Sequence, residues 1–260
     1  MKIVVLIKQV PDTYGDRKLN DEDGILDRTG PDAVTDEINE RALEVALQFK
    51  KVHGGEVTVL AMGPAGAIKS LRKCLAMGAD HAVHVTDGLL AGSDVVQTSV
   101  TIAAALRTLE FDLVLAGNES TDGRSAAVPA MIAELLTLPQ LTFLRTVQIS
   151  DGIVSGERIT EDGYLLVQAA LPAMVSVTDQ VAEPRYPGLK GTLAARKKPL
   201  ITLTATDLGM PADDVGGTHS WSQIDSVVVR PPRAKGKVIT DDGTAVKQII
   251  DFLATAKLVS

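Results

Sequence analysis

The segment DLVLAGNESTDGRSAAVPAMIAELL, residues 112–136, joins a short apolar run to a helical pattern through a loop of small polar residues. Three earlier parts of the chain repeat this order of an apolar run followed by a helical pattern. They are residues 2–10 with 35–55, 56–62 with 63–80, and 81–85 with 92–110. Apolar strands that alternate with helices are typical of a parallel sheet covered on both faces. The sequence therefore predicts an α/β fold with a mostly parallel, doubly wound sheet.

After Leu138 the pattern changes to short strands separated by tight Asp-Gly turns at residues 151–152 and 162–163. Short strands joined by such turns predict an antiparallel meander over residues 140–178, which extends the parallel sheet or packs beside it. Residues 182–211 are rich in proline and glycine and show little periodicity apart from TLAARKK at 192–198, so we expect a loop-rich excursion there.

The last part of the chain is predicted to contain a strand from Asp225, a Pro-Pro stop, a basic linker and an amphipathic helix. One side of that helix carries Val246, Ile249, Ile250 and Leu253. We expect residues 1–228 to form the α/β domain, and residues 229–260 to form an arm whose helix packs on a partner subunit.

The composition argues against several classes of function. With a net charge of -7 and no long block of Lys and Arg, the chain is not expected to bind nucleic acid. No apolar run approaches the roughly 18 residues of a membrane span, so we expect no membrane insertion. The single cysteine, Cys74, excludes an internal disulfide and suits a reducing compartment. Because the N-terminal run resembles a strand and not a signal peptide, a cytoplasmic protein is predicted.

The loop of residues 117–128 has the richest polar chemistry among the loops expected at the carboxyl ends of the strands, where ligands bind in open α/β sheets. Its small residues would let the backbone approach a ligand, and the following helix offers free N–H groups that favour an anion. Further donors come from Asn118, Ser120, Thr121 and Ser125. The loop has no Lys, and neither a G-x-x-x-x-G-K-[ST] nor a G-x-G-x-x-G pattern is found. Phosphate binding and helix capping by Asp122 or Ser125 explain the pattern equally well.

The side chains typical of catalysis are not arranged for it. His81 and His84 lie three residues apart on a predicted strand, so their side chains leave opposite faces and cannot share a metal ion. Cys74 lies within a helix among apolar residues, where a buried thiol is expected. No G-x-S-x-G nucleophile pattern is found. The chain is therefore expected to bind a nucleotide and not to be an enzyme.

Three stretches in order carry a family resemblance. The first is MKIVVLIKQVPDT at residues 1–13. The second spans residues 62–136 and contains MGP, LRKCLAMGAD and LVLAGNESTDGRSAAVPAMIAELL. The third is LPAMVSVTDQVAEPRYPGLKGTLAARKKP at residues 171–199. Together they resemble the beta (small) subunit of electron transfer flavoproteins, over essentially the whole chain. The resemblance implies a heterodimer with an alpha subunit, an FAD shared with that subunit, and AMP as a structural ligand of the beta subunit.

The resemblance also implies a route for electrons. Acyl-CoA dehydrogenases and other flavin dehydrogenases would donate electrons to the FAD of the heterodimer. Electron transfer flavoprotein-quinone oxidoreductase would then pass these electrons to the respiratory chain. In that scheme the beta subunit positions a flavin and makes or breaks no substrate bonds itself.

The AMP-binding positions of the family carry over to residues of this chain. They are Leu6, Asp36, Met62, Gly117, Asn118, Glu119, Ser120, Thr121, Asp122, Gly123, Arg124, Ser125, Ala126, Ala127 and Val128. Asp36, Met62 and Arg124 differ from the residues of some family members at these positions. Arg124 could bind a phosphate bidentately, although an exposed arginine at a helix start needs no ligand to explain it.

Two further sites follow from the resemblance. Tyr14 aligns approximately with a tyrosine that touches the flavin, and the alternative is a buried aromatic that plugs its own loop. Residues 182–199 resemble the recognition loop, in which one leucine enters a hydrophobic pocket of partner dehydrogenases. By its place after Tyr186 that leucine is Leu189, and both residues form the predicted docking site. The alternative is a leucine folded onto its own domain.

Two other functions stay open. One is a bifurcating or specialised electron transfer flavoprotein in which a second FAD replaces AMP in the nucleotide site. The other is a stand-alone adenine-nucleotide-binding protein of the stress type, which would bind ATP as a homodimer and need no redox partner. Fold analogy by itself does not separate these functions.

Overall fold

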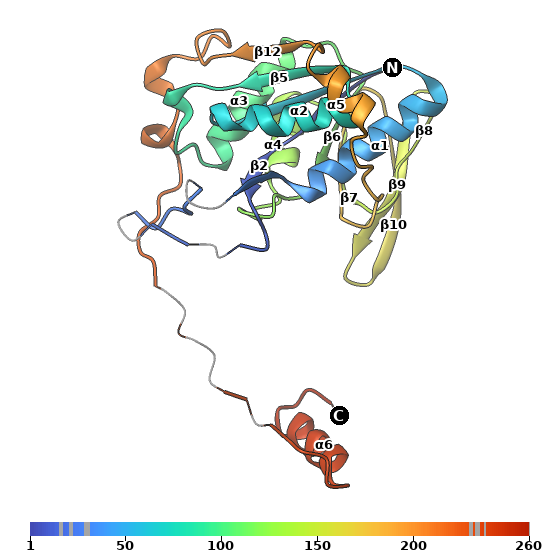
Figure 1. Cartoon of the computed structure of the whole chain (residues 1–260), viewed down its shortest axis with the longest axis vertical. Coiled ribbons are helices and arrows are strands. Elements are labelled where there is room, and N and C mark those ends of the chain that lie inside the picture. The colour runs from blue at the N-terminus through green and yellow to red at the C-terminus, as the bar shows by residue number, and fades with distance from the viewer. Residues whose placement is uncertain are drawn as a thin grey trace. The chain divides into compact units, whose positions relative to one another are not determined.

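The computed structural model describes residues 1–15, 18–20, 23–28, 32–228, 231, 235–236 and 238–259. The chain divides into two compact units, Met1–Ile224 and Asp225–Ser260 (Figure 1). The sequence predicted a boundary after residue 228.

The larger unit is built on one mixed sheet, which has ten strands in the part of the chain that the structure describes. The strands are β1 (Lys2–Leu6), β4 (Glu56–Met62), β5 (His81–Val85), β6 (Leu113–Gly117), β7 (Gln140–Leu144), β8 (Gln148–Ser150), β9 (Ile153–Thr160), β10 (Gly163–Ala170), β11 (Ala173–Val177) and β12 (Leu200–Leu203). Their order is β10-β9-β7-β11-β6-β1-β4-β5-β12, and β8 pairs with β9. Every neighbouring pair from β7 to β12 in this order is parallel. The predicted α/β fold is confirmed.

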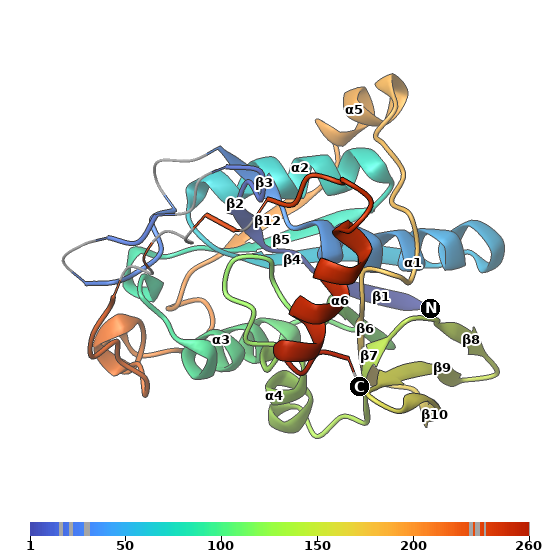
Figure 2. The ribbon, with the colours of Figure 1, turned by 90° about the horizontal axis from the view of Figure 1, so that it is seen from below.

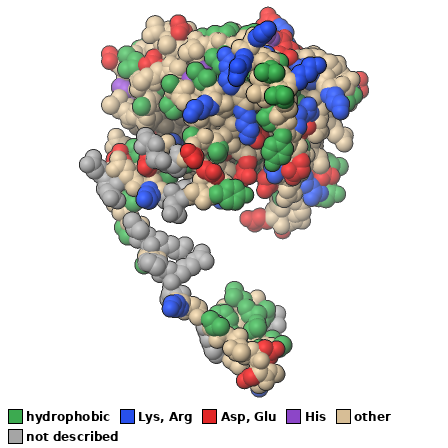
Figure 3. Space-filling model, viewed as in Figure 1, with side chains coloured by type: hydrophobic (Ala, Val, Ile, Leu, Met, Phe, Trp, Pro, Cys, Tyr) green, Lys and Arg blue, Asp and Glu red, His purple; other side chains and the backbone are tan. Residues whose placement is uncertain are grey.

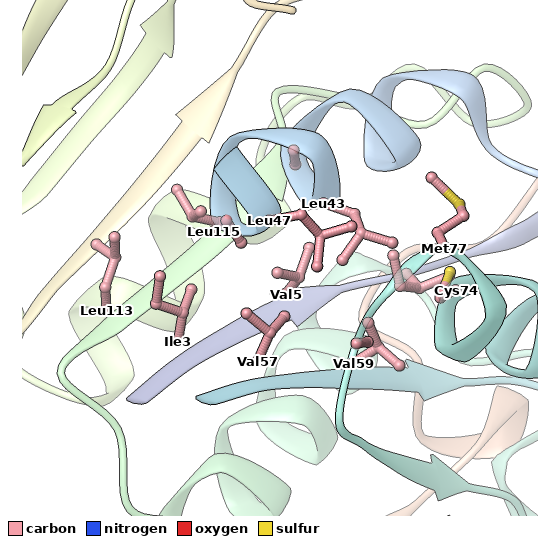
Figure 4. Close-up of a cluster of buried hydrophobic side chains, with 14 of the residues drawn as sticks. Ile3, Val5, Leu43, Leu47, Val57, Val59, Cys74, Met77, Leu113 and Leu115 are labelled. Atoms are coloured by element: carbon pink, nitrogen blue, oxygen red, sulfur yellow. The ribbon is translucent and has the colours of Figure 1, made fainter. Parts of the chain in front are cut away.

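Helices cover both faces of the sheet (Figure 2). The helices of this unit are α1 (Glu37–His53), α2 (Ile68–Met77), α3 (Val95–Arg107), α4 (Val128–Leu135) and α5 (Leu189–Ala195). Helices α1 and α2 pack on one face, where Ile3 and Val5 of β1 point, and α3 and α4 pack on the other, where Val4 and Leu6 point. Figure 4 shows Leu43 and Leu47 of α1 against the strand side chains of the first face. Because both faces are buried, the strands are apolar without alternation.

The predicted meander is only partly right. Strand β9 is antiparallel to β8, β10 and β7, but β7 and β11 pair with each other in parallel. All five residues of β11 are buried, because this strand lies between β7 and β6 and not at an edge. The chain therefore extends one edge of the sheet with the β9–β10 hairpin and then returns to the interior of the sheet, a step that strand and turn patterns do not reveal.

Two local predictions are also corrected, and one small sheet was not predicted at all. The stretch expected to be a loop-rich excursion contains α5 and the edge strand β12, which pairs with β5. A small second sheet, formed by β2 (Gln9–Pro11) and β3 (Ala33–Thr35), had no clear pattern in the sequence. Residues 225–228 lie in no helix or strand, so the expected strand is not found there. Strands such as β12, β2 and β3 have a neighbour on one side only. They are therefore less buried and carry little of the apolar pattern that predicts a buried strand.

The smaller unit contains α6 (Ala245–Thr255), the amphipathic helix predicted from the sequence. None of its residues is buried. Its apolar side chains include Val246, Ile249, Ile250 and Phe252, which are 69%, 48%, 54% and 66% exposed. Figure 3 shows this group of hydrophobic side chains on the surface of the unit. An apolar helix face of this kind is typical of a surface that a partner covers.

Candidate functional site

A cavity of about 290 Å³ opens at the carboxyl ends of β1, β4 and β6. The chain runs from β1 to β4 and β5 in one direction, and β6 lies on the other side of β1, so the sheet order reverses between β1 and β6. Such a switch point is where open α/β sheets bind ligands. The cavity is lined by Leu6, Ile7, Lys8, Arg28, Asn39, Met62, Ser93, Asp94, Val95, Thr98, Ile102, Ala116, Gly117, Asn118, Glu119, Ser120, Gly123, Ser125, Ala126, Val128 and Pro129.

Most of the residues predicted to bind AMP lie in this lining. Of the predicted set, Leu6, Met62, Gly117, Asn118, Glu119, Ser120, Gly123, Ser125, Ala126 and Val128 line the cavity. The other predicted residues, Asp36, Thr121, Asp122, Arg124, Ala127 and Tyr14, lie outside it. The structure thus brings the end of the first strand, the second β–α loop and residues 117–128 together around one space.

Asp36 shapes the loop from beneath. Its carboxylate is fully buried and caps α1 by accepting hydrogen bonds from the backbone N–H groups of Ile38 and Asn39 at 3.0 and 3.3 Å. The same carboxylate accepts from Thr121, through the backbone N–H at 2.7 Å and the hydroxyl at 2.9 Å. Asp36 therefore fastens the start of α1 to the loop with protein donors alone.

Asn39 and Gly117 set the floor of the cavity. The Asn39 side-chain oxygen accepts a hydrogen bond from the backbone N–H of Lys8 at 2.8 Å, which holds the amide in place. A Cβ at Gly117 would lie 2.6 Å from the Asn39 Nδ2 atom and 2.9 Å from Ile38 Cγ2. Only glycine leaves room for this side-chain amide at the end of β6. Asn39 was not predicted as a site residue, because its contact partners lie far away in the sequence.

The loop has no Lys of its own, but two basic side chains reach it from elsewhere. Lys8 Nζ lies 2.8 Å from Asp122 Oδ1 and 3.2 Å from Ser120 Oγ. Arg28 Nε and Nη2 lie 3.1 and 3.0 Å from Asp122 Oδ2. Burial acts to raise the pKa of the Asp122 carboxyl, yet the positive charges of Lys8 and Arg28 hold that pKa well below its usual range. Lys8 lies two residues after the end of β1, and it was not predicted as a site residue.

The start of α4 resolves one of the open alternatives. No side chain caps this helix, whose N-cap residue is Ala127, so neither Asp122 nor Ser125 acts as its cap. The loop backbone before it is left-handed at Arg124 and Ala126, with φ of 50° and 54°. Such positions cost about 1–3 kcal/mol each for residues other than glycine, and they cluster at ligand sites. Arg124 itself is exposed.

Asp94 closes the opposite wall. It caps α3 by accepting a hydrogen bond from the Gln97 N–H at 2.9 Å, and it also accepts from the backbone N–H groups of Trp221 and Ser222 at 2.8 and 3.0 Å. Burial of the carboxyl acts to raise its pKa, but these hydrogen bonds outweigh it and lower the pKa. Ser93, Asp94 and Thr98 were not predicted as site residues, because hydrophilic loop and helix-start residues carry no distinctive pattern.

The predicted docking residues are exposed. Tyr186 is 94% and Leu189 79% exposed, so Leu189 is not folded onto its own domain. Leu189 begins the short helix α5, and a Cβ at Gly191 would lie 2.2 Å from the Ala76 carbonyl oxygen, which shows how closely α5 lies on α2. Upstream, Arg41 Nη1 donates to the Ala182 carbonyl oxygen at 2.7 Å.

Tyr14 is 99% exposed, which rules out the buried plug and leaves its side chain on the surface. The expectation of a buried Cys74 is confirmed, and burial raises the pKa of its thiol. His84 is buried with Nε2 3.2 Å from the Gly63 carbonyl oxygen, while His81 pairs with Glu56. Within the described residues, no group of His, Cys, Asp or Glu is arranged to hold a metal ion. None of the described helices has both the length and the apolar character needed to cross a bilayer.

Comparison with known proteins gives consistent matches. Residues 23–208 match the family model described as the electron transfer flavoprotein domain. The chain is 49% identical to the electron transfer flavoprotein subunit beta of Mycobacterium tuberculosis (strain ATCC 25618 / H37Rv), over 99% of each chain. It is 34% identical to the protein of the same name from Thermoanaerobacterium thermosaccharolyticum, over 100% of each chain. Identity is also 34% with the caffeyl-CoA reductase-Etf complex subunit CarD of Acetobacterium woodii, over 98% of this chain and 97% of the relative.

Proposed function

The chain belongs to the electron transfer flavoprotein family as a beta subunit, and on that premise we propose that its cavity binds AMP as a structural ligand. In this role the chain and an alpha subunit form a heterodimer that holds one FAD. The heterodimer takes electrons from acyl-CoA and other flavin dehydrogenases and delivers them to the respiratory chain through electron transfer flavoprotein-quinone oxidoreductase. The beta subunit positions and insulates the flavin and has no substrate-bond chemistry of its own.

The cavity at the β1/β6 switch point is the observation that carries the AMP proposal. Its rim combines loop backbone, an uncapped helix start and the hydroxyls of Ser93, Ser120 and Ser125. Free N–H groups and hydroxyls are suited to a phosphate, and the apolar side chains of Leu6, Met62 and Ile102 offer a surface for a purine.

The volume favours a mononucleotide. Small-molecule sites measure roughly 300–1,000 Å³, and this cavity, at about 290 Å³, lies just below that range. FAD contains an AMP moiety joined to a riboflavin phosphate, so a whole FAD would extend well beyond these walls. The one feature that favours the second candidate is the likeness to a subunit of a caffeyl-CoA reductase-Etf complex. A specialised complex of that kind could place a second FAD here.

Two surfaces supply the partner contacts in this proposal. The exposed apolar side of α6 would pack on the alpha subunit, and Leu189 with Tyr186 would dock dehydrogenases. Burying one leucine contributes about 1.5–3 kcal/mol, which suits transient docking. Figure 3 shows Lys and Arg side chains gathered on the face that carries α2 and α5, so acidic partners would be steered toward Leu189.

Co-purification of the chain with its alpha subunit tests the proposed function. The heterodimer should contain one FAD by absorbance and one AMP by extraction and chromatography. Two flavins per heterodimer and no AMP would favour the second candidate. A nucleotide-free monomer that does not bind the alpha subunit would refute both, and an ATP-bound homodimer would support a stand-alone nucleotide-binding protein.

A further inference from the structure

Lys8, Arg28 and Asp122 form a compact charged group at the edge of the cavity. The Lys8 ammonium contacts one oxygen of the Asp122 carboxylate at 2.8 Å, and the Arg28 guanidinium contacts the other through two nitrogens at 3.0 and 3.1 Å. The three residues come from the end of β1, from the segment before β3 and from the loop after β6. Nothing in the local sequence around any of them points to the other two.

The exposure of the three side chains is uneven. The Asp122 side chain is 0% exposed, whereas those of Lys8 and Arg28 are 40% and 45% exposed. Both basic residues line the cavity, and Asp122 does not. The carboxylate therefore lies beneath, and the cations lie between it and the ligand space.

The charges of this group do not balance. Within the group, one carboxylate is paired with two cations, although Asp94 and Glu119 also line the cavity. An ammonium has three N–H donors and a guanidinium has five. Lys8 and Arg28 therefore keep donors that are not used by Asp122.

We propose that Lys8 and Arg28 bind the phosphate of the nucleotide in this cavity, and that Asp122 is a positioning residue that holds both cations ready. This inference rests on the proposed nucleotide site and assigns two residues to it. A phosphate monoester carries close to two negative charges at neutral pH, so it would accept hydrogen bonds from the donors of Lys8 and Arg28 that Asp122 does not use. The cations would thereby make the site selective for a nucleotide over a nucleoside.

The surroundings of Lys8 fit this role. The Lys8 ammonium lies over Ser120 and Gly123, since Ser120 Oγ is 3.2 Å away and a Cβ at Gly123 would lie 3.9 Å from Nζ. Ser120 and Gly123 belong to the same cavity wall. The ammonium, the Ser120 hydroxyl and the loop backbone therefore face one small volume, which a phosphate can fill.

The test uses the full-length chain in complex with its alpha subunit, after removal of bound nucleotide, titrated calorimetrically with AMP and with adenosine. Lys8→Met and Arg28→Gln should each weaken AMP binding by about tenfold or more, because a hydrogen bond to a charged group is lost. Adenosine binding should change by less than about twofold. Lys51→Met, on the exposed end of α1, removes the same charge far from the cavity and is the matched control.

Each outcome decides the assignment. Selective weakening of AMP supports it, and equal weakening of AMP and adenosine overturns it in favour of a latch that only joins segments. Unchanged AMP binding in both variants also overturns it, as does a wild-type complex that binds AMP no better than adenosine. A wild-type complex that binds neither probe would refute the nucleotide site itself. If Lys8→Met does not fold, Arg28→Gln and the loss of AMP affinity with rising salt in the wild type still give an answer.

Discussion

Arg185 and Glu44 form a bidentate ion pair, in which Nε lies 2.7 Å from Oε2 and Nη2 lies 2.8 Å from Oε1. The Glu44 side chain is only 6% exposed, and Arg185 also donates its backbone N–H to Oε2 at 3.2 Å. Burial acts to raise the pKa of the Glu44 carboxyl, and the hydrogen bonds from Arg185 outweigh it and hold the pKa below its ordinary value. Glu44 belongs to α1, so the pair fastens the segment just before Tyr186 and Leu189 to that helix. The exposed Leu189 side chain therefore follows a segment that is held in place.

Replacing Arg185 by Ala is expected to destabilise the protein, because it leaves the Glu44 carboxylate buried without its cation. Arg185 is 36% exposed, so the cost should be about 1–3 kcal/mol, the range for a lost hydrogen bond to a charged group. Urea denaturation measures it. Adding Glu44→Gln to this variant should recover part of the loss, since a neutral amide needs no cation. A double variant less stable than Arg185→Ala alone would contradict the role of the pair.

Leu189→Ala is expected to slow reduction of the flavin by dehydrogenases and to leave alpha-subunit binding and flavin content unchanged. The loss of most of a buried leucine side chain in the docked complex corresponds to about tenfold weaker docking. Stopped-flow reduction with several flavin dehydrogenases provides the measurement. Val52→Ala, which trims a side chain that is 74% exposed at the far end of α1, serves as the control. Reduction rates that match the wild type with every dehydrogenase would rule out docking through Leu189.

Gly117→Ala should disrupt the nucleotide site, whereas Gly88→Ala, outside the cavity lining, should be tolerated. The new methyl at Gly117 would lie 2.6 Å from Asn39 Nδ2, while a methyl at Gly88 would meet no atom within 4 Å. Overpacking of this kind costs about 1–3 kcal/mol. Thermal unfolding and the AMP content of the purified heterodimer test both variants. Full AMP content in Gly117→Ala would show that Asn39 can move aside without loss of the site.

Asp122→Asn should lower stability in a pH-dependent way. Because the pKa of Asp122 lies below its ordinary value of 3.8 in the folded protein, ionised Asp122 stabilises the fold above that value. The contribution disappears as the pH falls toward the folded pKa. The wild type should therefore exceed the variant by about 1–3 kcal/mol at neutral pH, with a shrinking difference below about pH 4. Paired thermal melts across this range would contradict the interpretation if the difference stayed constant.

Ile250→Asp is expected to abolish association with the alpha subunit without changing the stability of the larger unit. Ile250 is 54% exposed on the apolar side of α6, and a partner would have to bury the new carboxylate. Size-exclusion chromatography of the co-expressed subunits reports association, and a thermal melt reports folding. Lys247→Gln lowers the net charge by the same amount at an exposed position of the same helix and should leave the heterodimer intact. Normal assembly of Ile250→Asp would exclude α6 as a contact surface.

Much of the fold follows from local sequence patterns. Continuous apolar runs followed by helical patterns predicted β1, β4, β5 and β6 and the helices α1 to α4, because strands buried on both faces need no polar positions. The loop of residues 117–128 stood out through its small and hydroxylated residues. The same reasoning placed β11 in a meander, where it would pair with β10, but β11 pairs with β6 and β7. A short apolar strand suits either position, so its residues do not reveal its neighbours. Neighbouring residues determine which segments become strands, and they carry less information about which strands meet.

By itself, the sequence determined the β–α units and the polar loop that joins the strand and the helix of the fourth. Only the tertiary structure decided that Lys8 and Arg28 meet Asp122, across sequence separations of 114 and 94 residues. The physical reason is that backbone propensity and apolar periodicity act over a few residues, whereas a binding site collects side chains through the order of strands in the sheet. Lys8 gains its role only because β1 lies beside β6, which brings the loop with Asp122 within its reach.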